Sequence, residues 1–154
     1  MNRSQLVGKS FVLDTCSLRK LLGRVEDFIE SLAENGATTA ITSVILFEIL
    51  GKAKEGYLFP LPEKVNILNL IKFEKLKFFD LPPFKGLIDR ILNDLKFPFW
   101  KSYIQNNSRD YLIALTALEN KALLVTENIL DFEVWKTFGL LGFKVYEIEE
   151  ILYG

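Results

Sequence analysis

Short apolar runs alternate with segments of helical periodicity along most of the chain. The predicted strands cover 10–14, 38–42, 77–81, 122–125 and 143–146. Between them apolar residues recur every three or four positions, as in amphipathic helices, and the predicted helices cover 15–34, 44–56, 63–76, 85–95, 109–120 and 130–138. Ser43 is the expected N-cap of the second helix. The segment "FPFWKSYIQNNS" (97–108) fits neither pattern and is predicted to be a loop or an irregular link.

This alternation predicts the fold class. Strands separated by helices favour an α/β protein with a mainly parallel central sheet, covered by helices as a three-layer α/β/α sandwich. The sequence contains no internal repeat and no low-complexity linker. We therefore expect a single domain over 1–154, with a helical arm or insertion at about 52–100.

Composition narrows the chemistry and the compartment. The 154 residues include one cysteine and no run of about 18 apolar residues, so we expect no membrane span and a cytoplasmic protein. The sequence has no histidine. Its absence excludes Ser-His-Asp and Cys-His nucleophilic sites, zinc held by histidine and ribonuclease chemistry based on histidine pairs.

The charge is unevenly distributed, although the net charge is only −1. Residues 51–101 hold 10 Lys and Arg against 6 Asp and Glu, whereas the rest of the chain holds 9 against 14. Solvated helix faces explain such a difference, but a basic segment rich in aromatic residues is also suited to RNA. "KFPFWKSY" (96–103) is the best candidate for stacking on bases; the alternative, which we favour, is that these aromatics form core or a dimer interface.

Acidic side chains recur where strands end. Asp14 ends the first predicted strand, and "TENILD" (126–131) follows the "ALLV" strand. Glu48 lies one turn inside the helix after the second strand, and Asp110 lies one helix length before "ALLV". Because ligands of open α/β sheets bind beyond the carboxyl ends of the strands, these acids can converge there. Taken singly, Asp14, Asp110 and Asp131 can equally be helix caps or first-turn acids.

Converging carboxylates need a positive partner. Either a Lys or Arg side chain or a hard divalent cation can supply it, because unpaired buried charges are costly. Carboxylate, hydroxyl and amide oxygens without His or Cys favour Mg²⁺ or Mn²⁺ over zinc. Such a site can activate water for attack on a phosphodiester.

Three stretches carry a resemblance to a known family. "FVLDTCSL", "ITSVILFEILGKA" and "SRDYLIALTALENKALLVTENILDF" resemble, in order, the successive motifs of the PIN-domain family, metal-dependent ribonucleases that include VapC-type toxins. The likeness spans nearly the whole chain and is loose over 52–100. It implies an acidic cluster that binds Mg²⁺ or Mn²⁺, formed by Asp14, Glu48, Asp110 and Asp131. It also implies supporting polar residues at Thr15, Ser43, Thr126 and Asn128.

The resemblance implies an activity and partners. The expected reaction is cleavage of single-stranded RNA by a metal-activated water, leaving a 5′-phosphate and a 3′-hydroxyl. A small antitoxin protein and a homodimer are the expected partners. Two positions depart from the family pattern: Glu127 stands where the toxins often have a basic residue, and Cys16 replaces the commoner Ser or Asn.

Other functions remain open on the sequence. A PIN-like RNA- or protein-binding module without catalysis is the main alternative, and a metal-dependent DNA nuclease is a further one. A phosphatase with Cys16 as nucleophile would need an Arg at position 22, which is Leu22. A phosphoacceptor role for Asp14 would need a second acid at position 16.

Overall fold

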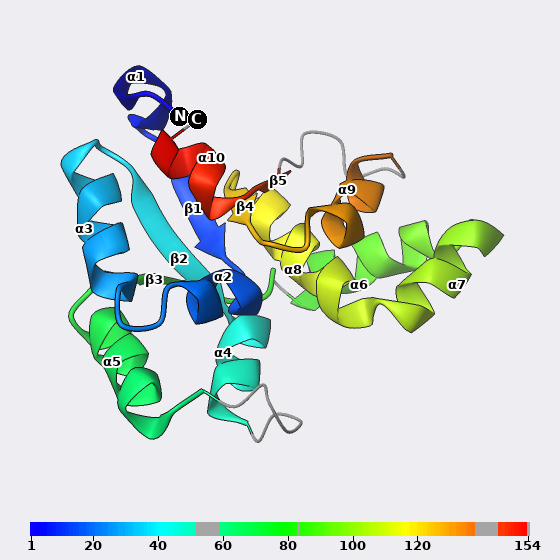
Figure 1. Cartoon of the computed structure of the whole chain (residues 1–154). Helices are drawn as coiled ribbons and strands as arrows, with labels where there is room; N and C mark the ends of the chain where they lie inside the picture. Colours follow the sequence, from blue (N-terminus) through cyan, green and yellow to red (C-terminus); the bar gives the residue numbers. More distant parts are fainter. Residues whose placement is uncertain (52–58, 83, 138–144, 154) are drawn as a thin grey trace.

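A five-stranded parallel sheet forms the centre of the molecule (Figure 1). The structure is a computed structural model that describes residues 1–51, 59–82, 84–137 and 145–153. The strand order is β3-β2-β1-β4-β5. The strands are β1 Ser10–Leu13, β2 Thr38–Thr42, β3 Lys77–Phe79, β4 Leu123–Val125 and β5 Val145–Tyr146. All five predicted strands are confirmed, although residues 143 and 144 of the last lie outside the described residues.

Helices connect and cover these strands. In chain order they are α1 Arg3–Leu6, α2 Thr15–Lys20, α3 Val25–Glu34, α4 Ser43–Leu50, α5 Leu61–Lys72, α6 Phe84–Asp94, α7 Pro98–Asn106, α8 Ser108–Glu119, α9 Ile129–Thr137 and α10 Ile148–Tyr153. The short α1 and α10 were not predicted. Residues 52–56 of the second predicted helix and residue 138 of the last lie outside the described residues. None of the described helices is both long and apolar enough to cross a membrane.

Burial of the central strand confirms the sandwich. Phe11, Val12 and Leu13 point alternately to opposite faces of the sheet, and each is fully buried. Both faces of the sheet are therefore covered, as expected for a parallel sheet between helical layers. The predicted α/β/α architecture is confirmed.

Several helix boundaries differ from the sequence prediction; α5, for example, ends at Lys72 and not at residue 76. Two differences have a clear local cause. The helix expected over 15–34 is broken into α2 and α3, because Gly23 adopts a φ of 79° that a helix cannot continue through. Thr42, rather than Ser43, caps α4, since its hydroxyl accepts a hydrogen bond from the backbone N–H of Ile45 at 3.3 Å. Ser43 is instead the first residue of the helix.

The predicted loop at 97–108 is wrong, because Pro98–Asn106 form α7. Proline at the first position of a helix loses no hydrogen bond and presets the backbone, so it begins α7 rather than preventing it. In Figure 1, α6 and α7 extend away from the sheet as a helical pair. Trp100 and Tyr103 of α7 pack on the buried Trp135 of α9, with ring centroids 5.4 and 4.8 Å away. For these two residues the core interpretation of "KFPFWKSY" is confirmed.

The parallel register brings several polar residues to one edge. Leu13 at the end of β1 pairs with Val125 at the end of β4. The residues that follow, Asp14 and Thr126, therefore leave neighbouring strands side by side. The N–H of Asp14 continues the ladder by donating to the carbonyl of Val125 at 3.0 Å. This carboxyl edge is where the candidate site lies.

Candidate functional site

Asp14 is the most deeply buried acid of the candidate site. Its side chain is 1% exposed, at the point where β1 ends and α2 begins. One carboxylate oxygen accepts the backbone N–H of Thr15 at 2.8 Å, and the other accepts the hydroxyl of Thr126 at 3.0 Å. Asp14 is therefore both an N-cap of α2 and a member of a polar cluster, so its two sequence interpretations are compatible.

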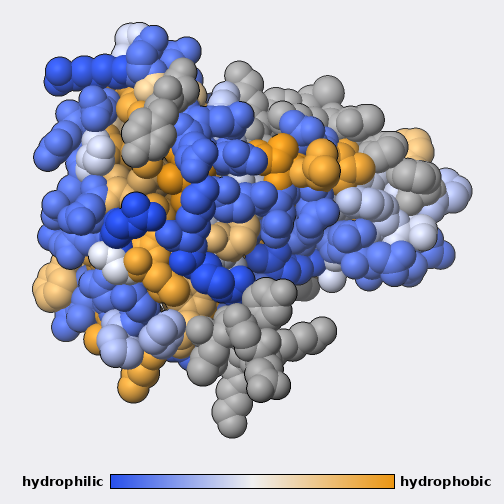
Figure 2. Space-filling view, viewed as in Figure 1, coloured by the Kyte–Doolittle hydropathy of each residue, from blue (hydrophilic) through white to orange (hydrophobic). Residues whose placement is uncertain are grey.

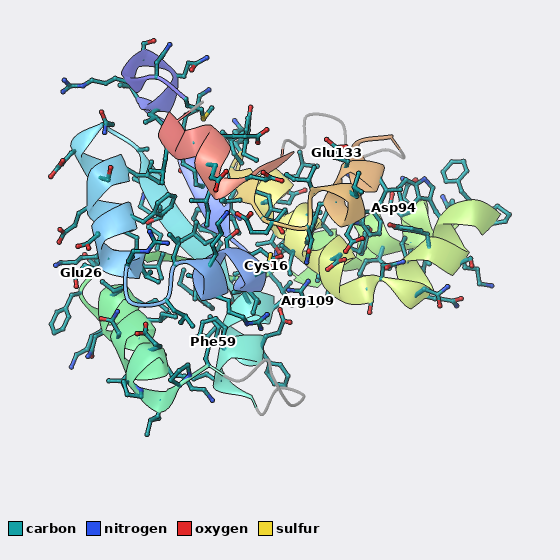
Figure 3. All side chains as sticks on the ribbon, in the orientation of Figure 1. Cys16, Glu26, Phe59, Asp94, Arg109 and Glu133 are labelled. Atoms are coloured by element: carbon teal, nitrogen blue, oxygen red, sulfur yellow. The ribbon has the colours of Figure 1, made fainter. Side chains whose placement is uncertain are left out.

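Arg109 joins three of the predicted acids. Its Nη2 lies 2.8 Å from Asp14, its Nε lies 2.7 Å from Glu48, and its Nη1 pairs with Asp110. In Figure 3, Arg109 and Cys16 lie near the centre of the molecule, where α2, α4 and α8 come together. The structure thus brings Asp14, Glu48 and Asp110 together around a single guanidinium.

The sequence predicts a positive partner for the acids without showing which residue it is, and the structure shows that it is Arg109. A local signal exists in hindsight, because Arg109 lies in the first turn of α8. Helix N-termini favour acids and disfavour cations, so an arginine there needs a further reason. Three carboxylates provide it, and they raise the pKa of Arg109 above its ordinary value against the opposing effect of burial. The side chain carries its charge at every physiological pH.

Hydroxyl groups hold the acids from the protein side. Thr15 donates its hydroxyl to Glu48 at 3.1 Å, which links the start of α2 to α4. Thr126 is fully buried and, besides donating to Asp14, accepts the N–H of Asn128 at 3.1 Å. Thr15 and Thr126 therefore lie in the cluster, as the sequence predicted. Their roles in function stay a prediction.

The charge balance of the cluster is visible at Asp110. Burial raises the pKa of this carboxyl above its usual value, while the ion pair with Arg109 lowers it. The negative charges of Asp14 and Asp131 raise the pKa further. Asp131 consequently lies close enough to interact electrostatically with Asp110. Burial raises the pKa of the Tyr103 hydroxyl on α7, and the negative charges of Asp110 and Asp131 raise it further. Tyr103 therefore interacts electrostatically with both acids.

Besides Thr126, three of the predicted residues lie outside the contacts of Arg109: Asp131, Asn128 and Ser43. Asp131 is exposed in the first turn of α9. Asn128 is also exposed and lines, with Asp131 and Glu127, a cavity of about 350 Å³ next to the cluster. The hydroxyl of Ser43 is buried and has no hydrogen-bond partner among the described residues.

The two departures from the family pattern have local explanations. Burial and the charge of Asp14 raise the pKa of the Cys16 thiol, so it is protonated at neutral pH and poorly suited to act as a nucleophile. Its sulfur lies 3.1 Å from the Thr126 hydroxyl and 3.4 Å from Asp14. Glu127 pairs with Lys20 at 3.1 Å and accepts the N–H of Ile148 at 3.2 Å, so its charge is locally compensated and it fixes the start of α10.

The donor types of the cluster suit a hard divalent cation. Its carboxylate and hydroxyl oxygens are the ligands that Mg²⁺ and Mn²⁺ prefer. Asp14, Glu48 and Asp110 already surround one cation, the guanidinium of Arg109. Within the part of the chain that the structure describes, no three acidic side chains are close enough together to share one metal ion. The donor atoms of the cluster therefore suit Mg²⁺ or Mn²⁺, but the carboxylates are spaced to surround the larger guanidinium of Arg109.

Comparison with solved structures identifies similar folds. The complex "DNA bound VapBC from Salmonella typhimurium" contains a chain with a TM-score of 0.57 and 20% sequence identity, covering 90% of this chain and 98% of its own. A chain of VapBC2 from Rickettsia felis, in a complex bound to a DNA fragment from the VapBC2 promoter, has a TM-score of 0.53 and 22% sequence identity. The match covers 90% of this chain and 98% of the other. A chain of VapBC-1 from nontypeable Haemophilus influenzae has a TM-score of 0.54 and 16% sequence identity. The match covers 90% of this chain and 97% of the other.

These neighbours confirm the resemblance at the level of the fold. They are toxin–antitoxin complexes whose VapC toxin is a PIN domain, and this chain has the PIN-like fold. No known family profile matches the sequence, and no curated protein does.

Proposed function

We propose that this chain is a Mg²⁺- or Mn²⁺-dependent endoribonuclease that cleaves single-stranded RNA. One observation carries the proposal: three carboxylates from separate elements converge on one cation at the carboxyl edge of a PIN-like sheet. Burying like charges together is costly, so a fold without use for them has little reason to gather them. This argues against the alternative of a binding module that lacks catalysis.

In this proposal the acids hold the metal and handle the water. Asp14, Glu48, Asp110 and Asp131 are the ligand candidates; Mg²⁺ or Mn²⁺ bound there would supply an activated water and neutralise charge on the phosphodiester. The Thr126 hydroxyl and the Thr15 N–H fix the rotamer of the Asp14 carboxylate. Asp131 is exposed, and so is available to orient the attacking water or accept its proton.

We further propose that the protein is the toxin of a toxin–antitoxin pair. The solved neighbours are VapBC complexes, two of them bound to DNA. The corresponding partner of this chain would be a small antitoxin protein, and a homodimer is the expected state of the chain itself. The antitoxin partner rests on analogy with these neighbours, which are 16–22% identical to this chain, and the homodimer rests on the resemblance of the sequence to the PIN-domain family.

A cleavage assay tests the nuclease. Mixed single-stranded RNA is incubated with the wild-type protein in Mn²⁺, Mg²⁺ or EDTA, beside single-stranded DNA of the same sequence. We expect RNA cleavage that EDTA abolishes and that Asp14→Asn lowers by at least about a hundredfold, since asparagine keeps the helix cap but removes the charge. Glu34→Gln is the control, because Glu34 is exposed at the end of α3, at the opposite edge of the sheet.

The assay separates the alternatives. Cleavage by Asp14→Asn at the wild-type rate, with circular dichroism showing an intact fold, would contradict this assignment of the site. Faster cleavage of DNA than of RNA would favour the DNA nuclease. If folded wild-type protein cuts neither substrate with either metal, the binding module becomes the better explanation.

A further inference from the structure

We propose that Arg109 is a built-in competitor of the metal: its guanidinium occupies the cation position of the acidic cluster and must leave when a divalent ion binds. This inference rests on the proposed function, since it concerns the same acids. It assigns to Arg109 a positioning role, in which the side chain holds the acids in place while no metal is bound.

All three guanidinium nitrogens of Arg109 take part in ion pairs. Each of its three nitrogens contacts a different carboxylate, on Asp14, Glu48 and Asp110. These acids come from the end of β1, from α4 and from α8. A planar fork of this kind satisfies several carboxylates at once and sets the distance between them.

The other carboxylate oxygens of Glu48 and Asp14 also accept hydrogen bonds from the protein. Glu48 presents one oxygen to Arg109 and the other to the hydroxyl of Thr15. Asp14 presents one to Arg109 and the other to the hydroxyl of Thr126. Asp14 is the more fully used of the two: its Oδ1 accepts from Arg109 and from the Thr15 N–H, and its Oδ2 accepts from Thr126 and from the Cys16 thiol. Because a carboxylate has about four lone-pair positions, a metal ion that binds Asp14 must displace one of these donors.

Arg109 is the donor that can leave. Thr126 is fully buried, and the N–H that holds Asp14 belongs to the backbone of Thr15. The side chain of Arg109 is already 37% exposed, and a long side chain with many rotamers can turn its guanidinium toward solvent without moving the backbone. A dication beside a retained guanidinium would also be repelled by it, and the charge of one would reduce the attraction of the acids for the other.

Metal affinity measures this competition without any cleavage. Mn²⁺ is titrated by calorimetry into the wild-type chain, Arg109→Gln and the control Arg3→Gln, which removes a charge from an exposed position on α1. We expect Arg109→Gln to bind Mn²⁺ at least about fivefold more tightly than the wild type, the low end of coupling between linked sites. Arg3→Gln should match the wild type.

Thermal unfolding gives a second readout. In EDTA, Arg109→Gln should unfold at a lower temperature than the wild type, because three acids lose their counter-charge. Saturating Mn²⁺ should raise its Tm by more than it raises that of the wild type. Arg109→Lys keeps a charge but cannot bridge three carboxylates, so it should fall between the two in Mn²⁺ affinity and provides the test if Arg109→Gln does not fold in EDTA.

The outcomes distinguish this inference from the proposed function. Equal or weaker Mn²⁺ affinity in Arg109→Gln, with metal still bound by the wild type, would overturn the competition and leave the nuclease proposal intact. Failure of the wild type and both Arg109 variants to bind Mn²⁺ or Mg²⁺ at millimolar concentrations would overturn both.

Discussion

At the scale of single residues, the cluster depends on hydroxyl groups that cannot be exchanged for methyl groups. Thr126 is fully buried, and its hydroxyl both donates to Asp14 and accepts from the backbone of Asn128. Threonine and valine have nearly the same shape, so replacing one by the other isolates the loss of these hydrogen bonds. The carboxylate of Asp14 would then be buried with one donor fewer.

We predict that Thr126→Val lowers the free energy of unfolding by about 2 kcal/mol, the usual cost of an unsatisfied buried partner of a charged group. Thr126→Ser keeps the hydroxyl and should lose less. Thr39→Val is the matched control, because Thr39 is equally buried and its hydroxyl has no partner among the described residues. Urea unfolding measures all three; equal effects of Thr126→Val and Thr39→Val would contradict the proposed support of Asp14.

Single residues also show which parts of the site could be predicted from the sequence and which could not. Asp14 and Glu48 were predictable because both lie just beyond the carboxyl end of a parallel strand. Asp14 directly follows β1, and Glu48 lies in the helix that directly follows β2; the sheet brings these two strand ends together. Arg109 could not be assigned, since its place in the first turn of a helix marks it as unusual among the 19 Lys and Arg residues but does not show that it reaches acids that lie 95 and 61 positions earlier in the chain. Long-range ion pairs become visible only when the elements are placed.

At the scale of elements, α7 lies beside the acidic cluster. Tyr103 interacts electrostatically with Asp110 and Asp131, and its ring packs on Trp135. Asp94 at the end of α6 accepts a hydrogen bond from the Tyr111 hydroxyl of α8, which attaches α6 to that helix, and another from Arg90 within α6 itself. Lys96 and Lys101, which flank the start of α7, are exposed. The helical pair is thus attached through α7 next to the acids, and it carries exposed lysines.

We predict that Lys96→Ala with Lys101→Ala weakens binding of single-stranded RNA and lowers its salt dependence. Each lost phosphate contact should reduce the slope of log affinity against log salt by about 0.7. The matched control is Lys9→Ala with Lys121→Ala, two exposed lysines that precede β1 and β4 at the opposite edge of the sheet. Fluorescence anisotropy in EDTA, which prevents cleavage, measures both pairs. An equal loss of affinity in both would indicate only a general effect of charge.

Elements also differ in how well the sequence predicts them. The strands and α8 follow from strong apolar patterns, and the structure confirms them within a few residues. The break at Gly23 and the helix that begins at Pro98 do not follow from the sequence pattern. A glycine can end a helix or be tolerated inside one, and a proline can end a helix or occupy its first position. The local pattern alone does not decide between these contexts.

At the scale of the whole molecule, apolar side chains remain on the surface. Figure 2 shows a largely hydrophilic face on which hydrophobic residues reach the surface in several separate places. A concentration of them lies on α4 and α5: Phe47 is 79% exposed and Leu61 is 72% exposed, with Leu50 and Val65 about half exposed. Lys64 of α5 donates to the carbonyl of Leu50, so the two helices are neighbours. Exposed apolar surface of this kind is typical of an interface.

We predict that this α4–α5 surface mediates the homodimer, so that the chain alone is dimeric at micromolar concentration and Phe47→Glu makes it monomeric. In a symmetric interface the substitution buries a glutamate charge in each of the two copies. One substitution should therefore raise the dissociation constant of the dimer by at least about a hundredfold. Leu130→Glu is the matched control, because Leu130 is 84% exposed on α9, outside this surface. Light scattering coupled to size exclusion measures the mass of each. A wild-type monomer at 100 times that concentration would contradict the dimer, and a dimer that resists Phe47→Glu but not Leu130→Glu would place the interface on α9 instead.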